Sequence, residues 1–302
     1  MAAGEQGGGV AAEDGRRVVL CHYHIFKNSG TSFDELLADN FRGEPVAFDG
    51  PYPFSVFVQD ELLKVIRNHP KATAFSSHQV RLPVPAALDI EVLPVVFLRH
   101  PLLRVRSVYE YLHRRERGSG VKRLFRFAVR STYTSRDEKR ASELSFSEWV
   151  REALDGQRPI GNLSNAQAQL LGGAYGRRAL SRVRPAEEGG VEVDLAQALR
   201  NLAAVDLLAR TECYGDDVAR FSEVLAARGI DFRYRDRRPA NTTAQDLHRP
   251  LAERLGRVRE SLGDELYERL AAVNTADLAL YRWASERLDG SAAGAAAPAP
   301  MR

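Results

Sequence analysis

The stretch RVVLCHYHIFKNSGTSFDELL, residues 17–37, decides the fold that this chain is expected to adopt. Residues 17–25 form a β-rich run with no charge inside it, which predicts a strand. Turn-forming Asn, Ser and Gly follow within residues 27–32, and from Thr31 onward large apolar side chains recur at helical spacing. The segment therefore predicts a strand, a glycine-containing loop and a helix, in that order.

A second strand is predicted at residues 92–98, where the sequence VLPVVFL is almost continuously apolar. Such a run is typical of a strand buried on both faces of a parallel sheet. Arg99 and His100 follow it, and Pro101 suits the first position of a helix. Charged side chains thus stand at the carboxyl end of the strand, which is where open α/β sheets bind their ligands.

The remaining periodicity predicts more helices than strands. Helical spacing covers residues 56–68, 101–112, 165–171, 195–204 and 216–228, two helices are expected within 249–288, and short strands are expected at 72–77 and 205–209. Together these elements predict a three-layer α/β fold of the P-loop-like kind, with a central parallel sheet flanked by helices and a helical C-terminal part. We expect one domain over residues 17–288, a disordered lead-in at 1–16 and a flexible tail at 289–302.

The composition of the chain excludes several classes of protein. A chain of 302 residues with 44% hydrophobic content buries a substantial core, and a net charge of +3 does not make a general polyanion binder, so we expect no nucleic-acid partner. Two cysteines are too few for a disulfide framework. No stretch approaches the roughly 18 consecutive apolar residues of a membrane span, and acids interrupt the N-terminal region where a signal peptide would be apolar. We therefore expect a soluble, cytoplasmic protein.

The loop at residues 27–32, KNSGTS, has the residue types of an anion site. Backbone N–H groups of the loop and the first helical turn would surround a phosphate, Lys27 would add a compact positive charge, and Thr31 and Ser32 would donate from their hydroxyls. The order differs from that of a nucleoside-triphosphate P-loop, G-x-x-x-x-G-K-S/T, because the lysine comes first. From the residues alone, an ordinary strand-to-helix turn with a Ser/Thr cap is the alternative.

Two segments carry a resemblance to a known family. HIFKNSGTSF, residues 24–33, resembles the H-I-P-K-T-G-G-T-S-F signature of the sulfotransferases related to heparan sulfate and uronyl 2-O-sulfotransferases, with Phe26 in place of proline and Asn28-Ser29 in place of Thr-Gly. FLRHPLLRVRSVYEYL, residues 97–112, resembles the family's F-L-R-D-P-x-x-R-x-x-S-x-Y-x-x-L element, with a histidine in place of the acid.

The resemblance implies an enzyme, a transferase that moves the sulfuryl group of 3′-phosphoadenosine-5′-phosphosulfate to a hydroxyl of a carbohydrate, lipid or other small molecule. It implies that this nucleotide is bound by the loop residues Lys27, Asn28, Ser29, Gly30, Thr31 and Ser32 and, at its 3′-phosphate, by Arg99 and Ser107. An Arg guanidinium suits a phosphate, and Ser107, two turns into the following helix, reaches the same ligand. The resemblance implies no metal.

His78 is the candidate for the general base. The segment FSSHQV, residues 75–80, resembles the family's short strand ending in Gly-His, with Ser77 in place of the glycine. The implied catalytic residues are His78, which takes the proton of the acceptor hydroxyl, and Lys27, which stabilises charge on the departing phosphate. General-base help is typically worth about a hundredfold to ten-thousandfold in rate. The alternative is a histidine that makes only loop hydrogen bonds.

His22 and His24 alternate on the first predicted strand, so both side chains point to one face of the sheet. Two histidines so placed are a fragment of a metal site, but the sequence shows no third ligand nearby. His24 also stands at the signature histidine, which favours a hydrogen-bonding role beside the loop.

Three downstream segments complete the comparison with the family, and a fourth segment is notable for its charge. Residues 165–173 and 207–221 resemble helical and strand-to-helix elements of the family with mainly structural roles, and residues 241–243 resemble a loop that closes over the cofactor. Residues 114–140 hold ten Lys/Arg against three acids, usually the mark of a solvated face. The alternative is a lid or an acceptor-binding segment, which an anionic acceptor would suit.

Two rival functions stay open at this stage. A P-loop kinase shares the strand, loop and helix, but it requires a lysine after the second glycine and a magnesium-binding Ser/Thr and Asp pair. A non-catalytic module that binds the nucleotide without turnover is compatible with the altered Asn28, Ser29 and with Gln169, which replaces an arginine of the family's helix. An activity assay with the sulfuryl donor would distinguish an enzyme from a non-catalytic binding module.

Overall fold

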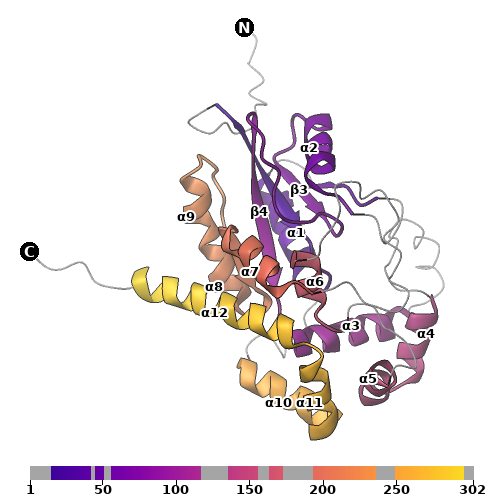
Figure 1. Cartoon of the computed structure of the whole chain (residues 1–302). Helices are drawn as coiled ribbons and strands as arrows, with labels where there is room; N and C mark the ends of the chain where they lie inside the picture. The colour runs from indigo at the N-terminus through magenta and orange to yellow at the C-terminus, as the bar shows by residue number, and fades with distance from the viewer. Residues whose placement is uncertain are drawn as a thin grey trace, which may run out of the picture.

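The fold was analysed in a computed structural model of the chain, which describes residues 15–41, 45–50, 56–116, 135–155, 163–172, 193–235 and 249–295. Figure 1 shows a central sheet with helices packed around it. Most of the basic segment 114–140 and the loop at 241–243 lie outside the described residues. No helix in the described part of the chain is both long and apolar enough to cross a membrane.

The sheet has five strands, all parallel, in the order β2-β3-β1-β4-β5. The strands are β1 (Arg17–Tyr23), β2 (Val46–Ala47), β3 (Ala74–Ser77), β4 (Ile90–Leu98) and β5 (Leu207–Arg210). Tyr23 at the end of β1 pairs with Ser77 of β3 and with Val96 of β4. The carboxyl ends of these three strands therefore meet at one edge of the sheet.

Helices cover both faces of the sheet. Val18 and Leu20 of β1 pack on one face against α1 (Gly30–Asn40), α8 (Tyr214–Ala219) and α9 (Phe221–Ala226). Val19 and Cys21 pack on the other face against α2 (Gln59–Asn68), α6 (Ala166–Gly172), α7 (Leu195–Ala203) and α12 (Thr275–Ala295). Because both faces are covered, β1 and β4 are apolar almost throughout, as the sequence predicted.

A further group of helices packs beyond the carboxyl ends of the strands, in the lower part of Figure 1. It contains α3 (Pro101–Glu116), α4 (Ser135–Glu143), α5 (Phe146–Leu154), α10 (Leu251–Leu262) and α11 (Asp264–Ala272). Trp149 of α5 is fully buried in this cluster together with Leu112 of α3 and Leu270 of α11. The cluster fixes the direction in which α3 leaves the sheet.

The α/β class and the parallel central sheet are confirmed, and several boundaries are corrected. The helix expected at 216–228 is two helices, α8 and α9, that meet at Arg220. Three helices rather than two lie between residues 249 and 288, because Gly263 adopts φ 77° between α10 and α11. Helix α12 continues to Ala295, past Leu288, where the sequence placed the start of a tail. The sequence did not predict α4 and α5.

Candidate functional site

Three side chains that the sequence singled out follow the carboxyl ends of three adjacent strands. His78 directly follows β3, Lys27 lies in the loop after β1, and Arg99 directly follows β4. After β1 the chain adds β2 and β3 on one side of it, and then adds β4 and β5 on the other side. The crevice between β1 and β4 is therefore a topological switch point. Open α/β sheets bind ligands at such points.

The loop between β1 and α1 has an unusual backbone. Lys27 and Ser29 both adopt positive φ, 68° and 61°, which L-residues avoid at a cost of roughly 1–2 kcal/mol each. Ser29 stands where the resembled signature has glycine, the residue that adopts this conformation without cost. Left-handed residues in a turn direct successive N–H groups into one concavity that favours an anion.

The N-terminus of α1 directly follows this turn. Its N-cap residue Ser29 makes no side-chain capping bond, and the described hydrogen bonds include none from the amides of residues 30–32. Thr31 is exposed and Ser32 half-buried, so both hydroxyls are accessible. The helix start therefore offers uncapped N–H donors and two hydroxyls together.

Position 30 requires glycine because a side chain would collide with a neighbouring residue, and not because of its backbone angles. A Cβ at this position would lie 1.9 Å from His24 Nε2. The His24 ring therefore packs directly on the first residue of α1, which keeps β1 and the helix start in close contact.

Positively charged side chains surround Lys27. Burial and the nearby charges of Arg99 and Arg114 lower its pKa to about 8, while Glu110 acts in the opposite direction. Its Nζ lies 5.0 Å from the centre of the Tyr111 ring, and within the described ranges no carboxylate forms an ion pair with it. An anion bound beside the loop would supply the missing charge.

Two arginines hold the carbonyl groups of the loop. Arg99 Nη1 donates to the Lys27 carbonyl oxygen at 2.9 Å, and Arg104 Nε donates to the Phe26 carbonyl oxygen at 3.1 Å. Arg99 Nε also lies 3.8 Å from a carboxylate oxygen of Glu212, and burial lowers the Arg99 pKa. Arg99 therefore positions the loop, a task that the sequence did not assign to it.

Ser107 lies on the face of α3 that meets the loop. Arg104, one turn earlier, contacts the loop through Phe26, and Tyr111, one turn later, packs on the Phe26 ring with centroids 5.2 Å apart. Ser107 itself is half-buried and makes none of the described hydrogen bonds. The structure thus places Ser107 on the face of α3 that meets the loop, and no described contact joins it to Arg99.

Arg254, which the sequence did not suggest, joins this group from α10. It is half-buried, and its charge adds to the effect of burial, which lowers the pKa values of Arg99 and His100. The described residues include no ion-pair partner for it. Helix α10 packs against α3, which brings its first turn to the site.

Asn28 ties the loop to the rest of the domain. It is fully buried, and its Nδ2 donates to the Phe97 carbonyl oxygen and to Gln167 Oε1, both at 2.7 Å. Gln167 Oε1 also accepts from the amide of Arg99 at 2.9 Å, and its Nε2 donates to the Arg99 carbonyl at 2.9 Å and to Asp277 at 3.2 Å. One buried amide thus joins the loop, the end of β4 and α12.

Asp277 completes this network from α12. Its carboxylate accepts from the amides of Gln167 and Ala168 at 3.1 and 2.7 Å and so caps α6. Burial raises the Asp277 pKa, against those hydrogen bonds, which lower it. Sequence analysis singled out Gln169 in this helix, but Gln167 makes the contacts to the site; its position on the buried face was the available signal.

His78 presents one ring nitrogen to the site. Its Nδ1 lies 2.8 Å from the His24 carbonyl oxygen, which can only accept, so Nδ1 carries the proton and Nε2 carries the lone pair. Burial and the adjacent His24 lower the His78 pKa to about 4, while Asp49 and Asp34 act in the opposite direction. His78 is therefore neutral near pH 7, with Nε2 able to accept a proton.

Asp34 is a third group beside the two strand histidines, which corrects the expectation that none lies nearby. Its Oδ1 lies 2.7 Å from His22 Nδ1 and its Oδ2 lies 3.2 Å from His24 Nδ1. Burial alone would raise the Asp34 pKa, but the two imidazoles lower it overall. One carboxylate oxygen thus serves each ring.

The geometry of these three residues favours a hydrogen-bonded clamp over a metal site. The rings of His22 and His24 are stacked, with centroids 4.8 Å apart and planes inclined by 19°. Lone pairs that lie in two nearly parallel planes do not converge on one ion about 2.1 Å away. The two oxygens of Asp34, in contrast, match the two N–H groups separately.

The comparisons with known proteins extend over most of the chain. No family model matches it. It is 27% identical over 270 residues to an uncharacterised protein of Archaeoglobus fulgidus. The aligned region covers 88% of this chain and 95% of that protein. The similarity therefore includes both the sheet and a large part of the surrounding helices.

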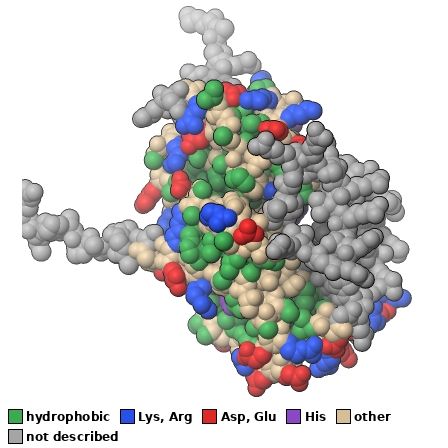
Figure 2. All heavy atoms as spheres, viewed as in Figure 1, with side chains coloured by type: hydrophobic (Ala, Val, Ile, Leu, Met, Phe, Trp, Pro, Cys, Tyr) green, Lys and Arg blue, Asp and Glu red, His purple; other side chains and the backbone are tan. Residues whose placement is uncertain are grey.

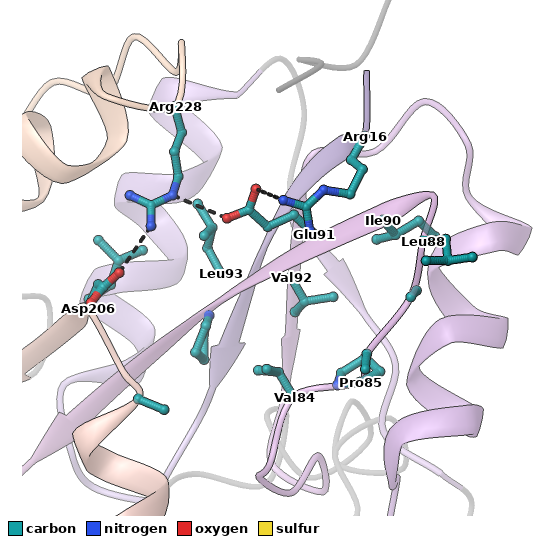
Figure 3. Close-up of a pocket in the computed structure, with 15 residues that line it drawn as sticks. Arg16, Val84, Pro85, Leu88, Ile90, Glu91, Val92, Leu93, Asp206 and Arg228 are labelled. Atoms are coloured by element: carbon teal, nitrogen blue, oxygen red, sulfur yellow. Dashed lines mark hydrogen bonds and ion pairs between the residues drawn. The ribbon is translucent and has the colours of Figure 1, made fainter. Parts of the chain in front are cut away.

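In two other places, charged side chains are mixed or paired with one another. On the face shown in Figure 2, the described Lys and Arg side chains alternate with Asp and Glu. A separate cavity of about 490 Å³ lies at the amino ends of β4 and β5, the opposite edge of the sheet from Lys27. Figure 3 shows that its charged lining residues pair with one another, Glu91 with Arg16 and Arg228, and Arg228 with Asp206.

Proposed function

We propose that the chain is a cytoplasmic sulfotransferase that uses 3′-phosphoadenosine-5′-phosphosulfate as donor and a hydroxyl of a carbohydrate, lipid or other small molecule as acceptor. One observation carries the proposal. The loop after β1, with Lys27 lacking a described counter-charge, adjoins His78 through Phe26, and Nε2 of His78 is unprotonated.

The residues present fit the nucleotide. Uncapped amides of residues 30–32, Lys27 and the hydroxyls of Thr31 and Ser32 would hold the 5′-phosphosulfate. Arg99, which contacts the loop, and Ser107, on the face of α3 that meets the loop, would hold the 3′-phosphate. Asn28 and Gly30 would act through the shape of the loop, because Asn28 is buried and Gly30 lies under His24.

The chemistry follows from the two catalytic residues. The acceptor oxygen forms a bond to sulfur while His78 Nε2 takes the hydroxyl proton, and the bond between sulfur and the 5′-phosphate oxygen breaks. The donor supplies the sulfuryl group and leaves as 3′,5′-diphosphoadenosine. Lys27 stabilises the negative charge that develops on the departing phosphate.

The strand order supports a P-loop-like three-layer fold for this function. In the order β2-β3-β1-β4-β5 the loop-bearing strand is central, and the next two site elements follow its two neighbours. The helices on both faces close the site from the sides and leave the carboxyl edge for ligands. A hydroxyl acceptor would enter at this edge, beside His78.

The proposal is tested with labelled donor and a panel of hydroxyl acceptors. Wild type should bind 3′,5′-diphosphoadenosine and transfer label. Lys27→Ala should lose transfer by about a hundredfold or more, and His78→Ala should lose transfer but keep nucleotide binding. Lys64→Ala, which removes an exposed lysine of α2, is the control and should match wild type.

Four outcomes would contradict parts of the proposal. Wild-type protein that binds the nucleotide no better than Arg99→Ala lacks the proposed donor site. Tight binding without transfer to any acceptor or to water indicates a non-catalytic module. Transfer of phosphate from ATP in place of sulfate indicates the kinase. Full transfer by His78→Ala would remove only the base assignment.

A further inference from the structure

An exposed aspartate holds the backbone from which His78 projects. Asp49 Oδ1 accepts two hydrogen bonds, from the Ser77 hydroxyl at 2.7 Å and from the His78 amide at 2.8 Å. The Ser77 hydroxyl oxygen in turn accepts from the Gln79 amide at 3.0 Å. In the opposite direction, the Gly50 amide donates to Gln79 Oε1 at 2.5 Å.

These bonds lock two loops together. The loop after β2, which carries Asp49, and the turn after β3, which carries His78, exchange hydrogen bonds in both directions. The turn after β3 can then place His78 Nδ1 at 2.8 Å from the His24 carbonyl. Ser77 is the residue that stands in place of the family's glycine, and only a side chain with a hydroxyl donates to Asp49 here.

The charged and titratable groups that act on His78 come from three elements. His24, at the end of β1, lies with its ring centroid 3.9 Å from that of His78, and Asp34 of α1 holds the His24 ring. Asp49 is the third. When His78 accepts a proton, the charge on its ring opposes any charge on His24 and is favoured by the two carboxylates.

We propose that Asp49 is a positioning residue for the transfer reaction. It fixes the backbone of His78 so that Nδ1 stays bonded to the His24 carbonyl and Nε2 faces the acceptor, and its charge favours the imidazolium formed in the reaction. The inference rests on the proposed function for its kinetic part. The tautomer of His78 stands independently of any activity.

The test compares Asp49→Ala, Asp49→Asn and the control Asp89→Asn. Because Oδ1 accepts both bonds, asparagine keeps both and removes only the charge, whereas alanine removes both bonds. Asp89 is an exposed aspartate at the amino end of β4, so its variant makes the same charge change far from His78. Thermal unfolding monitors whether each variant is folded.

The first readout is the imidazole ¹⁵N spectrum near pH 7, with His78 assigned by comparison with His78→Gln. Wild type, Asp49→Asn and Asp89→Asn should show the tautomer protonated at Nδ1, and Asp49→Ala should shift toward protonation at Nε2. The second is labelled transfer to p-nitrophenol and to water. Asp49→Ala should lower kcat by about a hundredfold with little change in the donor KM, and Asp49→Asn by a few-fold.

The outcomes separate the two proposals. If Asp49→Ala keeps the Nδ1 tautomer, or if Asp49→Asn loses it, the positioning role is wrong. If Asp49→Ala does not fold, Asp49→Asn decides alone, since its tautomer must match wild type. If the tautomers behave as expected but wild type neither binds nor uses the donor, the positioning geometry stands and the proposed function fails.

Discussion

The ring centroids of His78 and His24 lie 3.9 Å apart, and His78 Nδ1 donates to the His24 carbonyl oxygen at 2.8 Å. The two residues end adjacent strands, β3 and β1, so the contact depends on strand pairing and not on sequence proximity. His24 is in turn held by Asp34 and packs on Gly30. The orientation of the candidate base is therefore coupled to the start of α1.

The pH dependence of kcat/KM for the donor should be bell-shaped with unusual limits. His78 stays neutral down to about pH 4, so the acid limb should lie well below the ordinary histidine value of about 6.5. Lys27 loses its charge above about pH 8, which sets the alkaline limb. Lys27→Arg should move the alkaline limb upward and leave the acid limb in place. An acid limb near 6.5 would contradict the assignment of His78.

Binding of 3′,5′-diphosphoadenosine at pH 8 should take up protons. Free Lys27 is then about half protonated, and a bound anion raises its pKa, so the complex holds more protons than its components. Titration calorimetry in two buffers of different ionisation enthalpy measures this uptake. Lys27→Arg, which is charged throughout, should bind with almost none. Equal uptake by both proteins would show that another group is responsible.

Gly30→Ala should destabilise the protein by roughly 1–3 kcal/mol, because the added methyl overlaps the His24 ring. Gly256→Ala is the matched control: its Cβ meets nothing within 4 Å, and alanine favours the helix by up to about 1 kcal/mol. Urea unfolding measures both. The double variant His24→Ala/Gly30→Ala should recover part of the loss, and a loss that remains complete would place the cause elsewhere.

Gln167→Leu should cost about 3 kcal/mol of unfolding free energy. The substitution removes one of the two acceptors of Asn28 Nδ2 and leaves the backbone N–H and C=O of Arg99 without the partners that Gln167 gives them. Gln169→Leu, two residues away and half-buried, is the control and should change stability little. A double-mutant cycle between Asn28→Ala and Gln167→Leu should show coupling of at least about 0.5 kcal/mol. Additive effects would mean that their hydrogen bond contributes nothing.

Arg254→Ala should weaken binding of 3′,5′-diphosphoadenosine more than binding of adenosine 5′-monophosphate. The expected ratio is about tenfold, because the charge of Arg254 acts on Arg99, the residue proposed to bind the 3′-phosphate. Arg257→Ala removes an exposed arginine from the same helix as a control. Equal weakening for both nucleotides would indicate a general electrostatic effect instead.

Much of the fold could be predicted from local pattern. The apolar runs of β1 and β4, the loop between β1 and α1, and the start of α3 at Pro101 all appear where the sequence placed them. Helices were missed at a local glycine signal and where burial depends on tertiary contacts. Gly263 divides α10 from α11, and α5 is amphipathic and buries Trp149 against neighbours that periodicity does not reveal.

The candidate site divides in the same way. Lys27, His78 and Arg99 could be singled out because strand-end positions and motif order are properties of the sequence. Asp34, Asp49 and Gln167 could not, since each acts through a partner distant in the chain. The structure also shows that Arg99 donates a hydrogen bond to the Lys27 carbonyl, a structural role that its motif did not suggest.

By itself, the sequence determined a strand, loop and helix with a lysine at the turn and a second strand ending in Arg99, because these features depend on neighbouring residues. Only the tertiary structure decided which ring nitrogen of His78 is free, that Asp34 bridges His22 and His24, and that Gln167 joins the loop to α12. Those relationships are distances between groups from different strands and helices. Such distances are set by strand order and packing, which no local pattern contains.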